Sequence, residues 1–248
     1  MGPMDTKIGG TRESFPETAW LTVLSSPDPS SPQRRALLER LCSLYWRPVY
    51  KFIRASWGKS VENAKDLTQE FFARIIDSDL IVRYRPAQGR FRDFLKGALR
   101  NFLAEVHRDG ERLKRGGGTA TIPLDVDDVE TGAFARDLDR YTPEQIYDRE
   151  WAEGLMGECV RRLRRLLVSE GKELQYRVFE TVDLAGSPAP SYEALAREFG
   201  LPLHDVRNYL SRARAKLREL IVERISEYVS SKGEIEDELQ HLAEYLNR

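Results

Sequence analysis

The stretch that decides the fold runs from Phe91 to His107 and reads FRDFLKGALRNFLAEVH. Its apolar side chains recur every three or four residues, which is the period of one face of an α-helix. They form one continuous stripe: Phe91, Phe94, Leu95, Ala98, Leu99, Phe102, Leu103 and Val106. The stripe predicts a helix from Arg90 to about His107 whose apolar face is buried in a core.

The opposite face of this helix is cationic. Arg92, Lys96 and Arg100 follow one another at steps of one turn, and Asn101 and Arg108 lie near them. Cations one turn apart can follow a phosphate backbone, and an asparagine can hydrogen-bond the edge of a base. Because exposed charge is also the ordinary surface of a solvated helix, the face by itself leaves both interpretations open.

A second informative stretch covers residues 191–217 and reads SYEALAREFGLPLHDVRNYLSRARAKL. Ser191 can cap a short helix, and Gly200 suits the left-handed residue that ends one. The inner face of the first helix is Leu195, Ala196 and Phe199, and that of the second is Val206, Leu210, Ala213 and Leu217. The outer face of the second helix presents Arg207, Asn208, Ser211, Arg212 and Arg214. This pattern predicts a DNA-binding helix-turn-helix, with an ordinary helical hairpin as the alternative.

A third stretch covers residues 66–76 and reads DLTQEFFARII. Leu67, Phe71 and Ile75 lie on one face of the predicted helix, while Asp66 and Glu70 point elsewhere. A polar and acidic face does not favour DNA, but it can dock on a basic protein surface. A solvated face is the alternative.

Turn signals and periodicity together predict an all-α chain of two helical domains joined by a flexible linker. Thr142 and Pro143 are suitable N-cap and first residues for the helix that follows the linker. The helices are expected at 33–57 (a pair broken at Pro48), 61–77, 90–107, 143–168, 172–184, 191–200, 203–229 and 234–246. The expected segments are a disordered N-terminus (1–14), a first domain (15–115), the linker (116–142), a second domain (143–229) and a C-terminal helical extension (230–248).

The composition is that of a folded, soluble chain, with 41% hydrophobic and 32% charged residues and a net charge of −1. Charge is segregated, however: residues 83–115 and 207–218 are basic, and residues 125–139 and 234–244 are acidic. Such asymmetry indicates nucleic acid at some faces and another partner at others. No apolar run suits a membrane span or a secretion signal, so we expect a cytoplasmic, nucleoid-associated protein without membrane insertion.

No motif indicates catalysis. Cys42 and Cys159 lie far apart without metal-ligand spacing, so we expect free buried thiols and no metal. The histidines show no helical pairing, and phosphate-loop and nucleophile-elbow motifs are absent. We therefore expect neither a cofactor nor an enzyme, although an enzyme is one alternative to weigh.

Taken together, and in this order, the three stretches resemble the sigma-70 family, specifically its extracytoplasmic-function group. DLTQEFF from Asp66 resembles the family's core-binding helix, and FRDFL…ALRN from Phe91 resembles its promoter-melting helix. Residues 61–108 thus resemble sigma region 2, and residues 191–217 resemble the helix-turn-helix of region 4. The resemblance implies a non-catalytic factor that brings RNA polymerase to promoters and helps to melt them.

The resemblance also implies roles for particular residues. The partners would be core RNA polymerase, through its β′ clamp helices and β flap, and promoter DNA. The polymerase-facing residues would be Asp66, Gln69, Glu70, Phe72 and Arg74. The −10 element would be contacted by Arg92, Lys96, Arg100, Asn101 and Arg108, with a flipped base near Asn101. The −35 element would be read by Arg207, Asn208, Ser211, Arg212 and Arg214. Asp205 and Tyr209 depart from the family pattern, which puts the −35 sequence preference in doubt.

Regulation gives further expectations. The resemblance implies control by an anti-sigma factor or a Ser/Thr kinase. Thr68, within the predicted core-binding helix, is a candidate phosphorylation site. The alternative is an unmodified helix threonine. The acidic, amphipathic residues 234–248 would either mask the recognition helix or cap the second domain.

The main alternative is a stand-alone helix-turn-helix regulator with an unrelated N-terminal sensing or dimerisation domain. The basic, aromatic-lined helix at 91–108 argues against this alternative, since a sensing domain does not need one.

Overall fold

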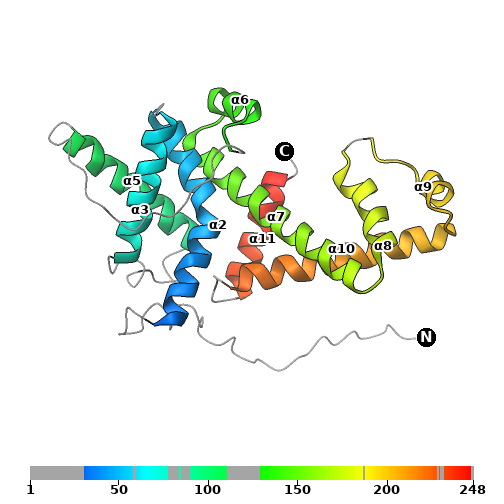
Figure 1. Ribbon diagram of the computed structural model, residues 1–248. Helices are drawn as coiled ribbons and strands as arrows, with labels where there is room; N and C mark the ends of the chain where they lie inside the picture. The colour runs from blue at the N-terminus through cyan, green and yellow to red at the C-terminus, as the bar shows by residue number, and fades with distance from the viewer. Residues whose placement is uncertain are drawn as a thin grey trace, which may run out of the picture.

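The structure, a computed structural model, describes residues 31–57, 60–77, 84, 90–110, 129–186, 188–227, 229 and 232–246. Every regular element within these ranges is helical, which confirms the all-α class (Figure 1). The α-helices are α2 (Pro32–Trp57), α3 (Val61–Asp77), α5 (Phe91–Gly110), α6 (Gly132–Arg140), α7 (Pro143–Ser169), α8 (Glu173–Phe179), α9 (Tyr192–Phe199), α10 (Leu203–Ser226) and α11 (Lys232–Leu246). A π-helical segment, η2 (Glu180–Leu184), extends α8. The predicted disordered N-terminus (1–14) and the Gly116–Gly118 run lie outside the described residues.

Local capping signals place the helix ends as predicted. The Thr142 hydroxyl accepts a hydrogen bond from the Gln145 amide, and the Gln145 side chain accepts one from the Thr142 amide, so α7 begins with a complete capping box. Ser191 caps α9 in the same way through the Ala194 amide. Gly200 ends α9 with a φ of 64°, the left-handed conformation that its position predicts.

The prediction that a helix pair breaks at Pro48 is wrong, because α2 is a single helix with Pro48 inside it. A proline in a helix interior removes one backbone hydrogen bond and costs stability. Packing offsets this cost, since Tyr45, Val49 and Ile53 on the adjoining turns are all fully buried.

The C-terminal part of the predicted linker is also folded, so that prediction is wrong from residue 129 onward. Within 116–142 the chain forms α6, which Thr131 caps and whose Phe134 is buried. Glu130, just before α6, accepts hydrogen bonds from Arg54 and Tyr50 of α2. These contacts fix the end of the segment to α2.

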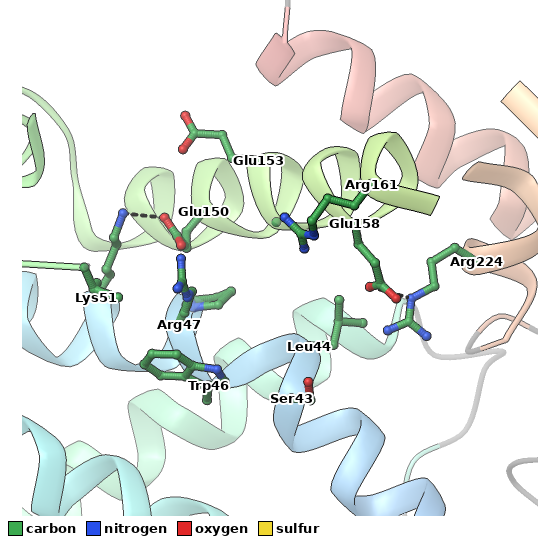
Figure 2. Close-up of a pocket in the computed structure, with 13 residues that line it drawn as sticks. Ser43, Leu44, Trp46, Arg47, Lys51, Glu150, Glu153, Glu158, Arg161 and Arg224 are labelled. Atoms are coloured by element: carbon green, nitrogen blue, oxygen red, sulfur yellow. Dashed lines mark hydrogen bonds and ion pairs between the residues drawn. The ribbon is translucent and has the colours of Figure 1, made fainter. Parts of the chain in front are cut away.

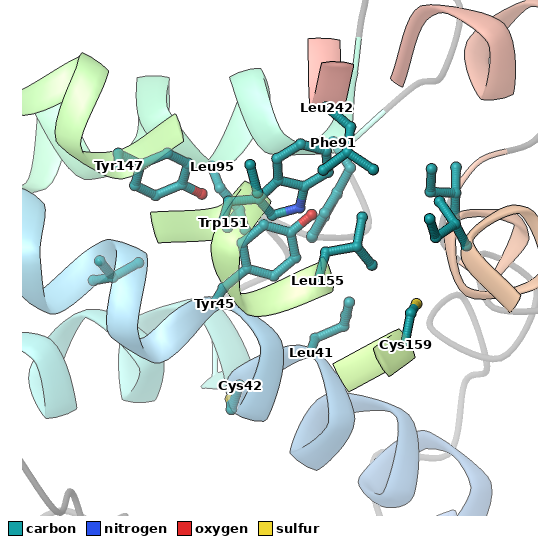
Figure 3. Close-up of a cluster of buried hydrophobic side chains, with 14 of the residues drawn as sticks. Leu41, Cys42, Tyr45, Phe91, Leu95, Tyr147, Trp151, Leu155, Cys159 and Leu242 are labelled. Atoms are coloured by element: carbon teal, nitrogen blue, oxygen red, sulfur yellow. The ribbon is translucent and has the colours of Figure 1, made fainter. Parts of the chain in front are cut away.

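Helix α7 connects the two ends of the molecule (Figure 1). Its N-terminal half packs on α2, where Tyr147 meets Phe52 edge to face, and its C-terminal half packs on α8 and α10. Figure 3 shows Tyr45 of α2, Phe91 of α5, Trp151 of α7 and Leu242 of α11 converging in the core. The buried side chains form one continuous cluster, to which α7 contributes along its whole length. The division of the chain into two domains therefore stays a prediction.

Candidate functional site

The outer face of α10 is the most accessible of the predicted sites. α9 and the turn at Gly200 position α10, whose Val206, Leu210 and Ala213 are buried. On the other side, Arg207, Asn208, Ser211 and Arg212 are exposed, and none of them makes an ion pair with another described residue. The predicted recognition face is therefore open.

Arg214 is the exception on this face. Its guanidinium donates to both carboxylate oxygens of Asp183, at 2.9 and 2.7 Å, and Asp183 belongs to η2. This bidentate pair raises the pKa of Arg214 and holds the side chain against η2. Arg214 would have to leave Asp183 in order to contact DNA.

The α3 surface matches its prediction only in part. Asp66 is exposed, whereas Glu70 pairs with Arg74 at 2.8 Å, and Arg74 also reaches Glu105 of α5 at 3.0 Å. The prediction that Phe72 faces a partner is wrong, because its side chain is 3% exposed and packs edge-on against Phe71.

Thr68 does not suit phosphorylation. Its side chain is fully buried, and its hydroxyl donates to the Ala64 carbonyl at 2.7 Å. A kinase cannot reach a hydroxyl inside the folded core. The prediction of a phosphorylation site at Thr68 is therefore wrong for the folded chain.

The cationic row of α5 meets acids of α7, although its last member, Arg100, stays exposed. Lys96 donates to both oxygens of Asp148 at 2.9 Å, and Arg100 donates to Glu144 at 3.0 Å. Lys96 is buried, and Arg92 is 0% exposed. The expectation that Arg92 and Lys96 form part of an open DNA-binding face is wrong, because α7 covers this side of the helix.

Arg92 lies in a closed polar pocket. Its guanidinium stacks 4.0 Å from the centre of the Trp151 ring and lies 3.4 Å from Asp148 and 3.3 Å from Glu238 of α11. Burial by itself would lower the pKa of Arg92, but the two carboxylates outweigh it and raise the pKa. Burial raises the pKa of the Glu238 carboxyl, because it disfavours the charged form, and the positive charge of Arg92 only partly offsets this rise.

The hydrogen bonding of this pocket is incomplete. No guanidinium nitrogen of Arg92 and no carboxylate oxygen of Glu238 has a hydrogen-bond partner among the described residues. The same holds for the hydroxyls of Tyr45 and Tyr147 and for the indole N–H of Trp151. Buried polar atoms without partners cost free energy, so this part of the core is polar and poorly satisfied.

The C-terminal half of the predicted −10 face stays accessible. Arg100, Asn101 and Arg108 are exposed. Next to Asn101 lies a hollow of about 170 Å³ between α3 and α5. The hollow is lined by Phe71, Arg74, Ile75, Ala98, Asn101, Phe102 and Glu105. Its floor is mainly aromatic and aliphatic, and its rim is polar.

The C-terminal helix α11 lies on α7 and α10, with Ile235 and Leu242 buried. This packing agrees with the prediction that the tail caps the second domain, to which α7 and α10 belong. The alternative, that the tail masks the recognition helix, is wrong because Arg207 and Arg212 remain exposed. Instead, Glu238 covers Arg92 of α5.

His241 of α11 lies among charged side chains at the contact between α11 and α5. Its Nδ1 lies 3.1 Å from the guanidinium of Arg90, and Arg92 and Asp148 face it from α5 and α7, with Glu244 on its own helix. Burial, then Arg92 and Arg90, lower its pKa below the ordinary value of 6.5. The His241 imidazole therefore binds a proton less readily when α11 is docked than when it is undocked.

We expect α11 docking to weaken as the pH falls below 6.5, and the loss to level off once the docked imidazole also protonates. The measurement is the melting temperature of the wild type minus that of His241→Gln across this range. Glu238 also titrates but is present in both proteins, so its effect on the melting temperature cancels in the difference. A difference that stays constant with pH would contradict the prediction.

A larger cavity of about 750 Å³ lies between α2 and α7 (Figure 2). Its charged walls pair with each other: Lys51 bonds Glu150, and Arg224 bonds Glu158 at 3.1 Å. Arg47, Glu153 and Arg161 complete a lining in which cations and acids nearly balance. This balance selects neither an anion nor a cation.

The described residues contain no cluster of His, Cys, Asp and Glu side chains that could hold a metal ion. Cys42 and Cys159 are free and buried, as predicted, and burial raises the pKa of these thiols to about 12 and about 11. Among the described helices, none is both long and apolar enough to cross a membrane.

The chain matches no protein-family model, no curated protein and no solved structure.

Proposed function

We propose that the chain is a transcription-initiation factor of the extracytoplasmic-function sigma type, which binds core RNA polymerase and recognises promoter DNA without catalysing a reaction. The observation that carries the proposal is the open face of α10, where Arg207, Asn208 and Arg212 stand free on the second helix of a helix-turn-helix. The N-terminal residues of such a helix contact base edges in the major groove, and arginine and asparagine are the side chains that bind these edges in pairs of hydrogen bonds.

The resemblance adds the polymerase to this proposal through α3. Exposed Asp66 and half-exposed Glu70 give α3 an acidic edge beside α5. Such an edge fits a basic surface on another protein. We assign this edge to the β′ clamp helices, while the β flap is the partner expected for the C-terminal half.

Reversing Asp66 and Glu70 to Lys should weaken affinity for core polymerase by at least about tenfold, because it opposes like charges at the interface. The measurement is a pull-down titration with core polymerase. Glu62→Lys is the matched control, since Glu62 is exposed on the first turn of the same helix. If the control and the double variant bind alike, the α3 assignment is wrong.

Promoter melting would use the end of α5 that remains open. A flipped base needs an aromatic surface and a polar group that contacts its edge. Phe71 and Phe102 floor the hollow beside Asn101, but both rings are buried and Arg74 lies 4.9 Å from the centre of the Phe102 ring, so Arg74 would have to move before a base could stack there. Arg100 and Arg108 would hold the neighbouring phosphates.

A second candidate is a helix-turn-helix regulator that acts without polymerase. The burial of Arg92 and Lys96 favours it, because the basic face of α5 that argued against this alternative is partly used inside the molecule. Both candidates use α10 in the same way, so α10 variants cannot separate them.

In vitro transcription separates the two candidates. The purified chain is added to core polymerase on a library of genomic fragments, and transcript starts are mapped. The sigma-type proposal expects new starts that depend on the chain and that vanish with Asp66→Lys/Glu70→Lys. If the chain binds duplex DNA but neither binds core polymerase nor directs starts, the stand-alone regulator is the better description.

A further inference from the structure

The strongest unassigned feature is the contact between α11 and the beginning of α5. Three side chains of α11 meet α5 and its acidic partner on α7: Glu238 lies 3.3 Å from Arg92, His241 lies 3.1 Å from Arg90, and the Tyr245 hydroxyl donates to Asp148 at 3.3 Å. The cations of this end of α5 are therefore met by groups from the chain's own C-terminus.

The contact imitates an anionic ligand. Glu238 is fully buried and brings a carboxylate to a guanidinium that no solvent reaches. The rest of α11 is acidic as well, with Glu234, Glu236, Asp237 and Glu244. A nucleic-acid phosphate would seek the same guanidinium groups through the same charge-assisted bonds.

The contact between Glu238 and Arg92 lacks hydrogen bonds, so a competing anion could replace the Glu238 carboxylate. Glu238 and Arg92 face each other without a hydrogen bond, and the hydroxyl of Tyr45 beside them has no partner among the described residues. A buried ion pair repays its desolvation only when hydrogen bonds satisfy its remaining atoms. Undocking of α11 would return these groups to water, so the polar contacts themselves do not hold the helix down.

The helix is held instead by a short apolar edge. Ile235 and Leu242 are buried and Leu239 is half-buried, while the opposite side of α11 is exposed. A helix of 15 residues is marginal on its own and depends on the surface on which it packs. α7, in contrast, carries Trp151 and Leu155 into the centre of the core and cannot leave without unfolding it.

We propose that α11 is an intramolecular strap that competes with single-stranded nucleic acid for Arg90 and Arg92 at the beginning of α5. The inference rests on the proposed function in assigning nucleic acid to α5. The strap docks in the free protein and undocks when a phosphate backbone takes its place, so that the free chain binds single strands weakly. A strap that is docked nine-tenths of the time weakens the apparent affinity about tenfold.

The test uses the full chain with Glu238→Gln and, as matched control, Glu236→Gln, which changes an exposed carboxylate on the same helix. Two quantities are measured: modification of Arg92 by phenylglyoxal, read by mass spectrometry, and binding of a fluorescein-labelled oligothymidine, read by anisotropy. Glu238→Gln should raise both the reactivity of Arg92 and the affinity for the oligonucleotide, and Glu236→Gln should change neither.

A chain that ends at Val229 gives the larger effect. Its affinity for the oligonucleotide should rise about tenfold, and the slope of log affinity against log salt should steepen by about 1.4 if two further phosphates are neutralised. Arg92→Ala in this shortened chain should remove about half of that added slope. A synthetic peptide of residues 232–246 should restore weak binding. Circular dichroism melts check that the shortened chain folds, and if it does not, the Glu238→Gln pair decides.

The outcomes separate the strap from the proposed function. If Arg92 stays unreactive in both Glu238→Gln and the shortened chain, the strap is overturned, whatever the chain does with polymerase. If Arg92 becomes reactive but oligonucleotide affinity does not rise, the competition is overturned, and the α5 assignment falls with it. Transcription from core polymerase then shows independently whether the sigma-type function survives.

Discussion

Replacing Asp148 with alanine should lower the free energy of unfolding by about 1.5–3 kcal/mol, because it removes the carboxylate that two buried cations share, while Lys96 keeps Asp93 at 3.0 Å and Arg92 keeps Glu238 at 3.3 Å. Lys96 donates to both oxygens of Asp148 at 2.9 Å, and Arg92 lies 3.4 Å from one of them. Lys96 is covered by α7, and Arg92 by α7 and α11 together, so neither cation reaches water while both helices are docked. The measurement is a urea titration followed by circular dichroism and extrapolated to zero denaturant.

Two further variants separate lost charge from lost packing. Asp139→Ala removes an exposed carboxylate of α6 and should change the free energy of unfolding by less than about 0.5 kcal/mol. Adding Arg92→Met, Lys96→Met and Glu238→Met to Asp148→Ala should recover most of the loss, because apolar side chains of similar volume can replace a buried ionic network once no carboxylate is left without its cation. A loss for Asp148→Ala as small as that for Asp139→Ala would show that the network is not buried in solution.

The proposed function expects that replacing Arg207 and Arg212 with alanine reduces binding of the complex with core polymerase to a promoter duplex by at least about tenfold, since each base-reading contact is worth about 1–3 kcal/mol. Both side chains are exposed on the outer face of α10, so their removal costs little stability. Binding is measured by gel shift on a duplex selected from genomic fragments, together with transcript yield.

The salt dependence of binding tells which part of the DNA these arginines contact. Loss of two phosphate contacts lowers the slope of log affinity against log salt by about 1.8, whereas loss of base contacts leaves the slope nearly unchanged. Arg165→Ala, which removes an exposed cation of α7, is the control. The α10 assignment is wrong if the double variant binds the promoter as tightly as this control does.

Local signals in the sequence predict most of the helices. The apolar stripe from Phe91 and the caps at Thr142, Ser191 and Gly200 depend only on neighbouring residues, and the structure has all of them. α6 is missed because it is short and lies among acidic residues that resemble a linker. Helix α2 continues past Pro48 because the burial of its neighbours outweighs the hydrogen bond that the proline removes. A local sequence pattern shows the proline but not this burial.

The candidate site is harder to predict, because burial of a charged face depends on which helix packs against it. The spacing of Arg92, Lys96 and Arg100 describes a row of cations, but it does not say whether phosphate or carboxylate will meet them. Glu144 and Asp148 stand one turn apart on α7, the spacing that matches this row, so the signal is present in the sequence. Only the packing of α7 on α2 shows that the two rows meet.

Thr68 and Phe72 illustrate a related limit. The α3 stripe of Leu67, Phe71 and Ile75 predicts one buried face, but α3 is buried over a wider arc, because it packs on α2 and also meets α5 through Phe71 and Phe102. Side chains at the edges of the predicted stripe therefore enter the core.

The path of α7 has a consequence for how such a chain could exchange its parts during evolution. A recombination joint between residues 142 and 143, where the linker is expected to end, would bring in a new α7 and separate Trp151 and Asp148 from the α2 and α5 surfaces that they fit. A joint at the turn of Glu170 and Gly171 would keep that fit and bring in only the helices that follow. Replacing the segment after Gly171 thus preserves more of the packing on α2 and α5 than exchanging whole predicted domains does.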